Sequence, residues 1–221
     1  MEFSSNTKQI LKKYKKDLKK KIGLGRNSSL FVHAIKKFYK NTDELIDVRI
    51  RSGAVNFDCK KGCTACCHLR VEVLPPEAFV ISDYLKSKTK ESVDYYIDKL
   101  REHVYSTKGK SFKEYIHPCP FLKSSGSCDI YSVRPHKCRA YLSMSVTHCN
   151  TDNIAAEDMH LNILAKVLSN DCIDVYKSKS CVMHPSELGK SVLAVLEDDS
   201  LKEKWADGEQ VFDLLPEKTM L

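Results

Sequence analysis

The chain has 221 residues and a formal net charge of +7, and this length suits one domain with a substantial buried core. No stretch approaches the roughly 20 apolar residues of a membrane-spanning helix, and the Lys-rich N-terminus lacks the apolar core of a secretion signal. Residues 1–22 hold eight lysines and two acidic residues, so the rest of the chain is nearly neutral. We therefore expect a cytoplasmic protein whose body has no broad basic face for nucleic acid.

The first expected element is a basic amphipathic helix within residues 1–26. Its apolar positions recur at three- and four-residue steps: Ile10, Leu11, Tyr14, Leu18 and Ile22. Such spacing places them on one face, with lysines on the others. Two interpretations stay open: the helix docks its apolar stripe on the body, or its lysines bind a polyanion such as nucleic acid, a phospholipid surface or an acidic protein surface.

A second helix is expected between Asn27 and Gly53, because Asn27-Ser28-Ser29 offers an N-cap and apolar residues follow at helical spacing. Asn41 and Thr42 are candidate break points within it. His33 is interpreted as a surface or packed histidine and not as a metal ligand. The helix ends just before the first cysteines, so its predicted role is to present that loop.

The central part of the chain predicts short strands and more helices. Val71 to Leu74 precede two prolines, and Pro76 suits the first turn of a helix in which Glu77 serves as a helix-end charge, with a catalytic or metal-binding role as the less favoured alternative. Residues 89–106 also show helical spacing. Two short runs flank a Ser/Gly turn at residues 123–127 and predict a β-hairpin that contains Cys119 and Cys128.

From Asp152 to Asn170 the helical pattern returns, a further helix is expected around residues 192–196, and the acidic tail through Trp205 and Phe212 is expected to end loosely. The predicted fold is mainly α with a short β-hairpin, its helices packed around a Cys-rich metal or iron–sulfur core. The predicted parts are the basic helix (1–26), a cysteine-cluster metal-binding domain (27–170) and a C-terminal helical extension (171–221).

Eight of the ten cysteines form two groups separated by 51 residues, and all eight are candidate metal ligands: Cys59, Cys63, Cys66, Cys67, Cys119, Cys128, Cys138 and Cys149. Disulfides are rare in a reducing cytoplasm, whereas thiolate metal sites persist there. Gaps of two and three residues let sulfurs converge on one ion through a tight turn. Cys172 and Cys181 lack such turns and are interpreted as thiols that bind no metal.

The metal stays open between zinc and iron, including a four-iron four-sulfur cluster, because four thiolates suit either. Adjacent side chains diverge, so Cys66 and Cys67 are expected to serve two centres, or one to bind and one to pack. Four histidines near cysteines could replace a sulfur: His68, His117, His136 and His148. Nearby cations could compensate the negative charge: Lys60, Lys61, Arg70, Arg134, Lys137 and Arg139.

The motifs Cys-x3-Cys-x2-Cys-Cys, Cys-Pro-Phe-Leu, Gly-x-Cys-x-Ile-Tyr and Arg-Pro-x-x-Cys-Arg resemble the YkgJ-type cysteine-cluster family of zinc- or iron-chelating proteins, over about residues 55–150. The resemblance implies that the eight cysteines hold metal, although no flanking motif accompanies Cys149. One branch is similar to flagellin lysine-N-methylases, which are thought to use an iron–sulfur centre and S-adenosylmethionine. No Gly-rich loop after a strand offers a conventional site for that methyl donor.

Three functions follow. The first is a cytoplasmic metalloprotein with a redox or catalytic role. The second is an iron–sulfur-dependent protein lysine methylase-like enzyme, which would need S-adenosylmethionine. The third is a zinc-stabilised module that binds a polyanion through the basic helix. A Cys–His nucleophile is disfavoured, because Cys67 and His68 are chain neighbours and need not face each other.

Overall fold

The computed structural model describes residues 5–23, 27–60, 62–151 and 154–215. Within this part of the chain the elements are α1 (Ser5–Ile22), α2 (Ser28–Arg51), η1 (Ala65–His68), β1 (Glu72–Val73), α3 (Pro75–Lys86), α4 (Lys90–Thr107), η2 (Tyr131–Val133), α5 (His136–Ala140), α6 (Val146–Thr151), α7 (Met159–Lys177), β2 (Ser186–Glu187), α8 (Leu188–Glu197) and α9 (Leu201–Ala206). The expected fold class, mainly helical with one short antiparallel strand pair, is confirmed.

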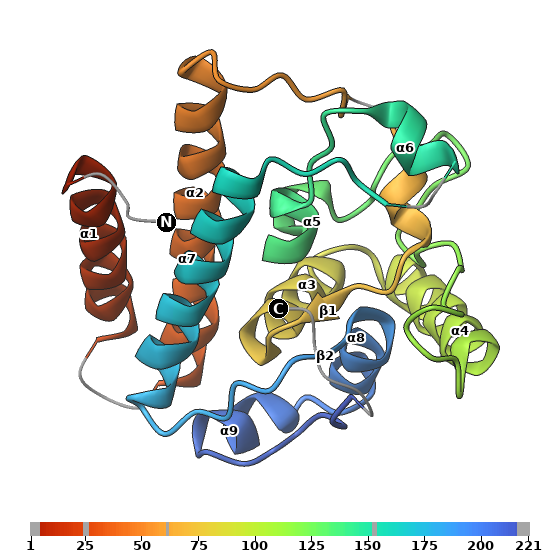
Figure 1. Cartoon of the computed structure of the whole chain (residues 1–221). Helices are drawn as coiled ribbons and strands as arrows, with labels where there is room; N and C mark the ends of the chain where they lie inside the picture. The colour runs from red at the N-terminus through yellow and green to blue at the C-terminus, as the bar shows by residue number, and fades with distance from the viewer. Residues whose placement is uncertain (1–4, 24–26, 61, 152–153, 216–221) are drawn as a thin grey trace.

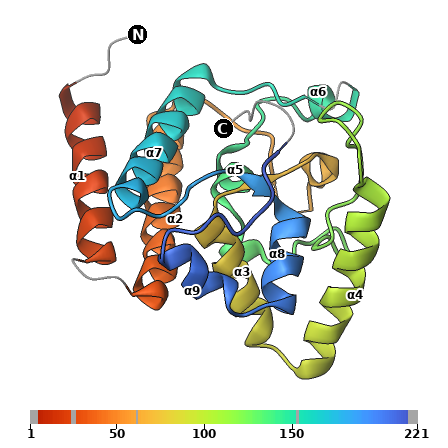
Figure 2. The same cartoon turned by 90° about the horizontal axis from the view of Figure 1, so that it is seen from below.

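Helices α1, α2 and α7 lie side by side and form one flank of the molecule (Figures 1 and 2). The apolar stripe of α1 is buried against this flank through Leu11, Tyr14, Leu18 and Ile22. Lys15 adds an ion pair with Asp171 of α7, with 2.6 Å between nitrogen and oxygen. Docking of the basic helix on the body is therefore observed, and most of its lysines stay exposed.

Helix α2 runs unbroken through Asn41 and Thr42, so the expected break point is wrong. Thr42 is buried; its hydroxyl donates a hydrogen bond to the carbonyl of Phe38 (3.0 Å) and also contacts Nδ1 of His136 (2.9 Å). These contacts satisfy the polar group inside the fold, which a helix-propensity argument cannot foresee. The predicted N-cap is confirmed, because the Asn27 side chain accepts a hydrogen bond from the amide of Leu30 (2.8 Å).

The other flank is built by α3, α4 and α8, and α9 closes it toward α2. Trp205 of α9 is fully buried, lies against Phe31, Phe79 and Tyr176, and donates its indole N–H to the carbonyl of Val182 (2.7 Å). The C-terminal tail is thus part of the main core as far as Phe212, and the expectation of a loose tail is corrected up to that point. Its last six residues lie outside the described part of the chain.

The main hydrophobic core contains residues of all three predicted parts, from Tyr14 to Phe212. A smaller core joins α1, α2 and α7 through Leu11, Leu45, Ile46, Leu161 and Leu164. The division into three parts at residues 26 and 170 stays a prediction.

The strand pair lies elsewhere than the sequence suggested. β1 pairs with β2, which brings Val73 opposite Ser186 across more than a hundred residues of chain. The expected hairpin around residues 123–127 forms a tight turn with one isolated bridge between Leu122 and Cys128. A pairing so distant in sequence leaves no local pattern, and this is why it was missed. No helix among the described residues is long and apolar enough to cross a membrane.

Helix α7 also begins and ends later than the sequence pattern suggested. Its N-cap is Asp158, which accepts from the amide of Leu161 (2.8 Å) and pairs with Arg49 of α2. Cys172 therefore lies inside this helix and is buried. The short helices α5 and α6, which carry Cys138 and Cys149, had no periodic signal because neither exceeds two turns.

Candidate metal centre

The two cysteine groups lie next to each other in the fold. The amide of Cys119 donates to the carbonyl of Cys67 (2.7 Å), and the amide of His117 donates to the carbonyl of His68 (2.9 Å). An isolated bridge between Leu69 and Ile116 continues this contact. The 51-residue separation is thus closed by backbone hydrogen bonds, which place the two loops at the same end of the molecule, near α6 (Figure 1).

Tight backbone turns position the first group. Gly62 has a φ of +89°, a left-handed conformation that residues with a Cβ rarely adopt. The amide of Cys63 donates to the carbonyl of Lys60 (3.0 Å), and the amide of Cys67 donates to that of Thr64 (2.8 Å). These bonds form the turn and the 3₁₀ segment η1, which carries Cys66 and Cys67.

The second group is held by a turn and by α5. In the turn, the amide of Lys123 donates to the carbonyl of Ser127 (2.9 Å), and Cys119 and Cys128 flank it and pack on the main core. Pro135 is the N-cap of the short helix α5, which carries Cys138 on the side of the other cysteines and Arg139 on the side of α2. Arg139 is buried and donates to Asp43 of α2 (2.7 Å), which fixes α5 against that helix.

Cys59 is held by a contact that no sequence motif predicted. Its sulfur accepts a hydrogen bond from the amide of Ser143 (3.2 Å), and the amide of Asp58 donates to the carbonyl of Ser143 (2.9 Å). The Asp58 carboxylate in turn accepts from the amide of Val146, the first residue of α6 (3.0 Å). This chain of bonds brings α6, and with it Cys149, to the first cysteine loop.

Four thiols from both groups form an inner set: Cys66, Cys119, Cys128 and Cys138. Burial raises the pKa of the Cys138 thiol well above its usual range, and charge on Cys119, Cys66 and Cys128 raises it further. Burial likewise raises the pKa of Cys119 to about 12, with Cys128 as a neighbouring charge. The four thiols are thus within range of one another's charge.

Cys59, Cys63 and Cys149 form an outer set. Burial raises the pKa of Cys59, and charge on Cys63, Cys66 and Cys149 acts in the same direction. Cys66 is a member of the inner set and also acts on Cys59, so it lies where the two sets meet. A hydrogen bond with Cys67, followed by burial, raises the pKa of Cys66. All ten cysteines are free thiols, so no disulfide competes with metal binding.

The thiols do not yet enclose an ion. Among the described residues, no three Cys, His, Asp or Glu side chains converge on one point that could hold a metal. The donor chemistry nevertheless fits zinc or iron, because cysteine sulfurs bind both metals after losing their protons. Thiols that keep their protons have no attraction to a common centre.

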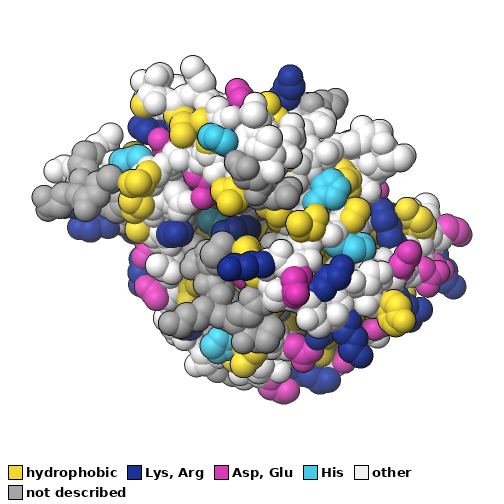
Figure 3. Space-filling model, turned by 45° about the vertical axis from the view of Figure 1, so that its right-hand side comes forward, with side chains coloured by type: hydrophobic (Ala, Val, Ile, Leu, Met, Phe, Trp, Pro, Cys, Tyr) yellow, Lys and Arg dark blue, Asp and Glu magenta, His cyan; other side chains and the backbone are white. Residues whose placement is uncertain are grey.

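The four candidate histidines differ in their surroundings. His136 is buried, and burial lowers its pKa to about 3. Its Nδ1 contacts Thr42, so this ring is already bound within the core. His68 lies over the carbonyl of Thr64 with its Nδ1 at 3.2 Å, and His117 contacts the carbonyl of Pro118. In Figure 3, histidines (cyan) and hydrophobic side chains (yellow, a colour that Cys shares) lie over the upper part of the face that is shown.

The candidate compensating cations divide into paired and unpaired ones. Arg70 is buried beside Glu72, 3.3 Å away, and Arg139 is paired with Asp43. Arg134 has neither an ion pair nor a side-chain hydrogen bond within the described residues, and its Nε is buried without a partner. Burial raises the pKa of Cys128 and of Cys138, whereas the charge of Arg134 acts to lower both. Arg134 thus lies near the inner set, as does Lys99, whose charge acts to lower the pKa of Cys119; Lys61 lies outside the described residues.

Glu77 is a structural carboxylate, as the sequence favoured. It is buried in the first turn of α3, where it accepts from the amides of Leu74 (2.8 Å) and His136 (2.7 Å). It therefore ties the start of α3 to the start of α5. Burial raises the pKa of Glu77 to about 7, and the hydrogen bond from the amide of His136 opposes that rise.

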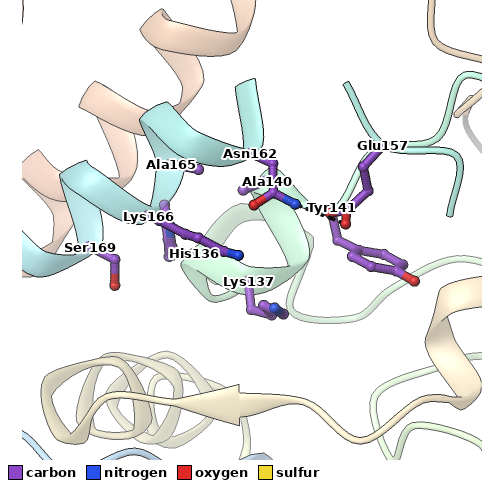
Figure 4. Close-up of a pocket in the computed structure, with 9 residues that line it drawn as sticks. All are labelled: His136, Lys137, Ala140, Tyr141, Glu157, Asn162, Ala165, Lys166 and Ser169. Carbon is purple, nitrogen blue, oxygen red and sulfur yellow. Dashed lines mark hydrogen bonds between the residues drawn. The ribbon is translucent and has the colours of Figure 1, made fainter. Parts of the chain in front are cut away.

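Two cavities adjoin the cluster. The first, about 40 Å³, lies between α5 and α7 and is lined by His136 and Ser169, with room for ordered water but not for a ligand. Figure 4 shows α5 and α7 facing each other across it, beside a hydrogen bond between Asn162 and Glu157. The second, about 480 Å³, lies between α2, the loop at residues 56–59 and η2, and has Cys59 in its wall. We refer to it as the Cys59 pocket.

The chain was compared with protein families, curated proteins and solved structures. A model of the CxxCxxCC family matches residues 58–160. This chain has one residue more than the family name between its first two cysteines, Cys59 and Cys63. No curated protein and no solved structure matches the chain. Residues 58–160 are therefore similar to the CxxCxxCC family, described as "Putative zinc- or iron-chelating domain".

Proposed function

We propose that this protein is a cytoplasmic metalloprotein in which zinc or an iron–sulfur cluster is held by the clustered cysteines, with a redox or catalytic role. The observation that carries the proposal is the contact between the two cysteine loops, in which the amide of Cys119 donates to the carbonyl of Cys67 (2.7 Å). These residues, far apart in the chain, meet only because the fold brings the two cysteine groups together. Four cysteine thiolates are the ligand set of structural zinc sites and of four-iron clusters.

The inner set is the proposed closed site. Cys66, Cys119, Cys128 and Cys138 would bind as thiolates, with Arg134 compensating their charge. The outer set of Cys59, Cys63 and Cys149, together with Cys67, would supply four further sulfurs for a second ion, which agrees with one vicinal cysteine serving each centre. A bound ion would contribute free energy to folding. An iron–sulfur cluster would also allow electron transfer.

The test is anaerobic purification followed by metal and sulfide analysis and visible absorption. A brown protein with stoichiometric sulfide identifies an iron–sulfur cluster, and colourless protein with stoichiometric zinc identifies zinc. Cys138→Ser should reduce metal content by about one centre, because three sulfurs leave the ion under-coordinated. Cys181→Ser, at a buried thiol outside both sets, is the matched control and should retain the metal. Full metal content in Cys138→Ser would reject the inner site.

A methylase-like activity is the second candidate, since the Cys59 pocket leaves space for a substrate beside the cysteines. The enzyme would transfer a methyl group from S-adenosylmethionine to a protein lysine. Incubation of metal-loaded protein with labelled S-adenosylmethionine and a cell extract tests this candidate. Absence of label in any protein, with the metal retained, rejects it.

Polyanion binding is the third candidate, and the exposure of the α1 lysines favours it. Docking buries the apolar stripe and leaves Lys12, Lys13, Lys16, Lys19 and Lys20 exposed. Replacing these five by Gln should abolish retention on heparin or on anionic vesicles without changing metal content. Unchanged retention would reject this function, and because the apolar stripe is kept, the helix should stay docked.

A further inference from the structure

The Cys59 pocket has the size and position of a ligand site. Its volume of about 480 Å³ lies within the usual range of small-molecule pockets. Cys59 stands in its wall, so a ligand there would lie beside the cysteine cluster. Neither the family description nor the proposed metal site assigns a role to this cavity.

The charged groups of the pocket differ in availability. Arg139 and Asp43 neutralise each other at 2.7 Å, and Arg139 also donates to the carbonyls of Arg134 and Ser132, both at 2.8 Å. Three bonds hold this guanidinium in place and pair its charge. The Asp43 carboxylate is half-exposed, and its charge is offset by Arg139.

Arg134 is the available cation. Its guanidinium carbon lies 4.1 Å from the centroid of the Tyr131 ring, and this stacking fixes the plane of the group. The side chain is half-buried, and no carboxylate or carbonyl accepts from it within the described residues. A partly desolvated guanidinium without an acceptor is costly, and planar oxyanions such as carboxylates match its paired N–H groups.

The rest of the lining limits the kind of anion. Ile46, Phe57 and Leu142 provide an apolar wall against which a hydrocarbon body can pack. Asp47 is exposed at the same pocket and adds a negative charge that disfavours a dianion such as phosphate. The lining thus complements one negative charge joined to an apolar group.

We propose that the Cys59 pocket binds a small monocarboxylate with an apolar body, whose carboxylate pairs with Arg134 while its body packs on Ile46, Phe57 and Leu142. This site shares Arg134 with the proposed metal site, and its place beside Cys59 would bring the ligand next to a bound ion.

The experiment measures binding to the full chain by calorimetry, with metal content determined on the same samples. The probes are 3-phenylpropionate, its neutral amide and inorganic phosphate. We expect the carboxylate to bind at least tenfold more tightly than the amide and than phosphate. Arg134→Gln should remove this preference, Arg134→Lys should keep part of it because one cation remains, and Asp47→Asn should strengthen carboxylate binding.

Two further variants keep the test decisive. Arg101→Gln changes an exposed arginine of α4 that pairs with Glu197, and should leave carboxylate binding unchanged. Ile50→Trp changes an exposed side chain that lines the pocket, and should block binding by occupying the space while keeping Arg134. Equal affinity for carboxylate and amide, or an intact preference in Arg134→Gln, would overturn the proposal. Preferential carboxylate binding by protein without metal would support this proposal, and the metal function is tested separately by the metal content of the same samples.

Discussion

The helical flanks and the cysteine loops of this protein are stabilised in different ways. The flanks bury large apolar side chains such as Trp205, Phe31 and Phe79, which are fully enclosed. Thiols there, such as Cys172, are packed like other small apolar groups. The loops that carry the inner and outer cysteine sets have half-buried thiols and short backbone turns. Phe121 and Ile130 of the second loop pack in the main core, and residues 62–68 of the first loop bury no side chain in it.

The difference indicates which region depends on a bound metal for its stability. A region with a large apolar core folds through burial, whereas loops with few apolar contacts need another source of free energy. Metal should therefore control the loops while the helices persist without it. Four predictions follow, from the largest expected effect to the smallest.

Removal of metal under reducing, oxygen-free conditions should have the largest effect. Because a structural thiolate site contributes on the order of 10 kcal/mol in small zinc domains, chelation should remove hydrogen-exchange protection from residues 62–68 and 117–130. Protection in α2 and α7 should fall far less. Uniform loss of protection across the chain would remove the distinction between the two regions.

Trp205→Ala tests the other side of the comparison. Loss of a fully buried indole and of its hydrogen bond should lower the free energy of unfolding by about 3–5 kcal/mol. Metal content should not change, because Trp205 lies in the core and not among the cysteine loops. Denaturant unfolding combined with metal analysis measures both, and loss of metal at equal folded fraction would show that the regions are coupled.

Glu77 joins the two regions, because it bonds to α3 and to the start of the cysteine-bearing α5. Burial raises its pKa from 4.5 to about 7, so the folded state binds a proton more tightly than the unfolded one. This contribution to stability is complete below pH 4.5 and is lost as pH rises to 7, by about 3 kcal/mol. Glu77→Gln should remove this pH dependence between 4.5 and 7.

The overall stability of Glu77→Gln should also fall at pH 5, where the Glu77 side chain of the folded protein is protonated, since the Gln amide nitrogen cannot accept the backbone N–H that a Glu77 oxygen accepts. Urea unfolding at several pH values measures both effects. If the free energy of unfolding depends on pH in the variant as it does in the unaltered protein, another titratable group causes that dependence.

Cys172→Ser should have the smallest effect. Its buried thiol touches neither cysteine set, so the substitution should lower the free energy of unfolding by on the order of 1 kcal/mol and leave metal content unchanged. Urea unfolding and metal analysis of the same sample measure this. A loss of metal comparable to that of Cys138→Ser would place Cys172 among the ligands.

The sequence by itself determined the elements whose signal is local. The three- and four-residue spacing of Leu11, Tyr14 and Leu18 defined α1, and Asn27 defined the start of α2. The cysteine motifs indicated the similarity of residues 58–160 to the CxxCxxCC family, because residue types at fixed offsets are visible in the chain without any fold. The metal-ligand assignments themselves rest on this signal and stay predictions.

Tertiary structure decided everything that joins distant segments. The β1–β2 pairing, the burial of Trp205 and Phe212, and the hydrogen bond from Ser143 to Cys59 have no local pattern. The unbroken course of α2 through Thr42 depends on His136, which lies almost a hundred residues away. The sequence could list eight cysteines, but only the folded chain separates an inner set around Cys138 from an outer set around Cys59, because distances between remote side chains arise from packing.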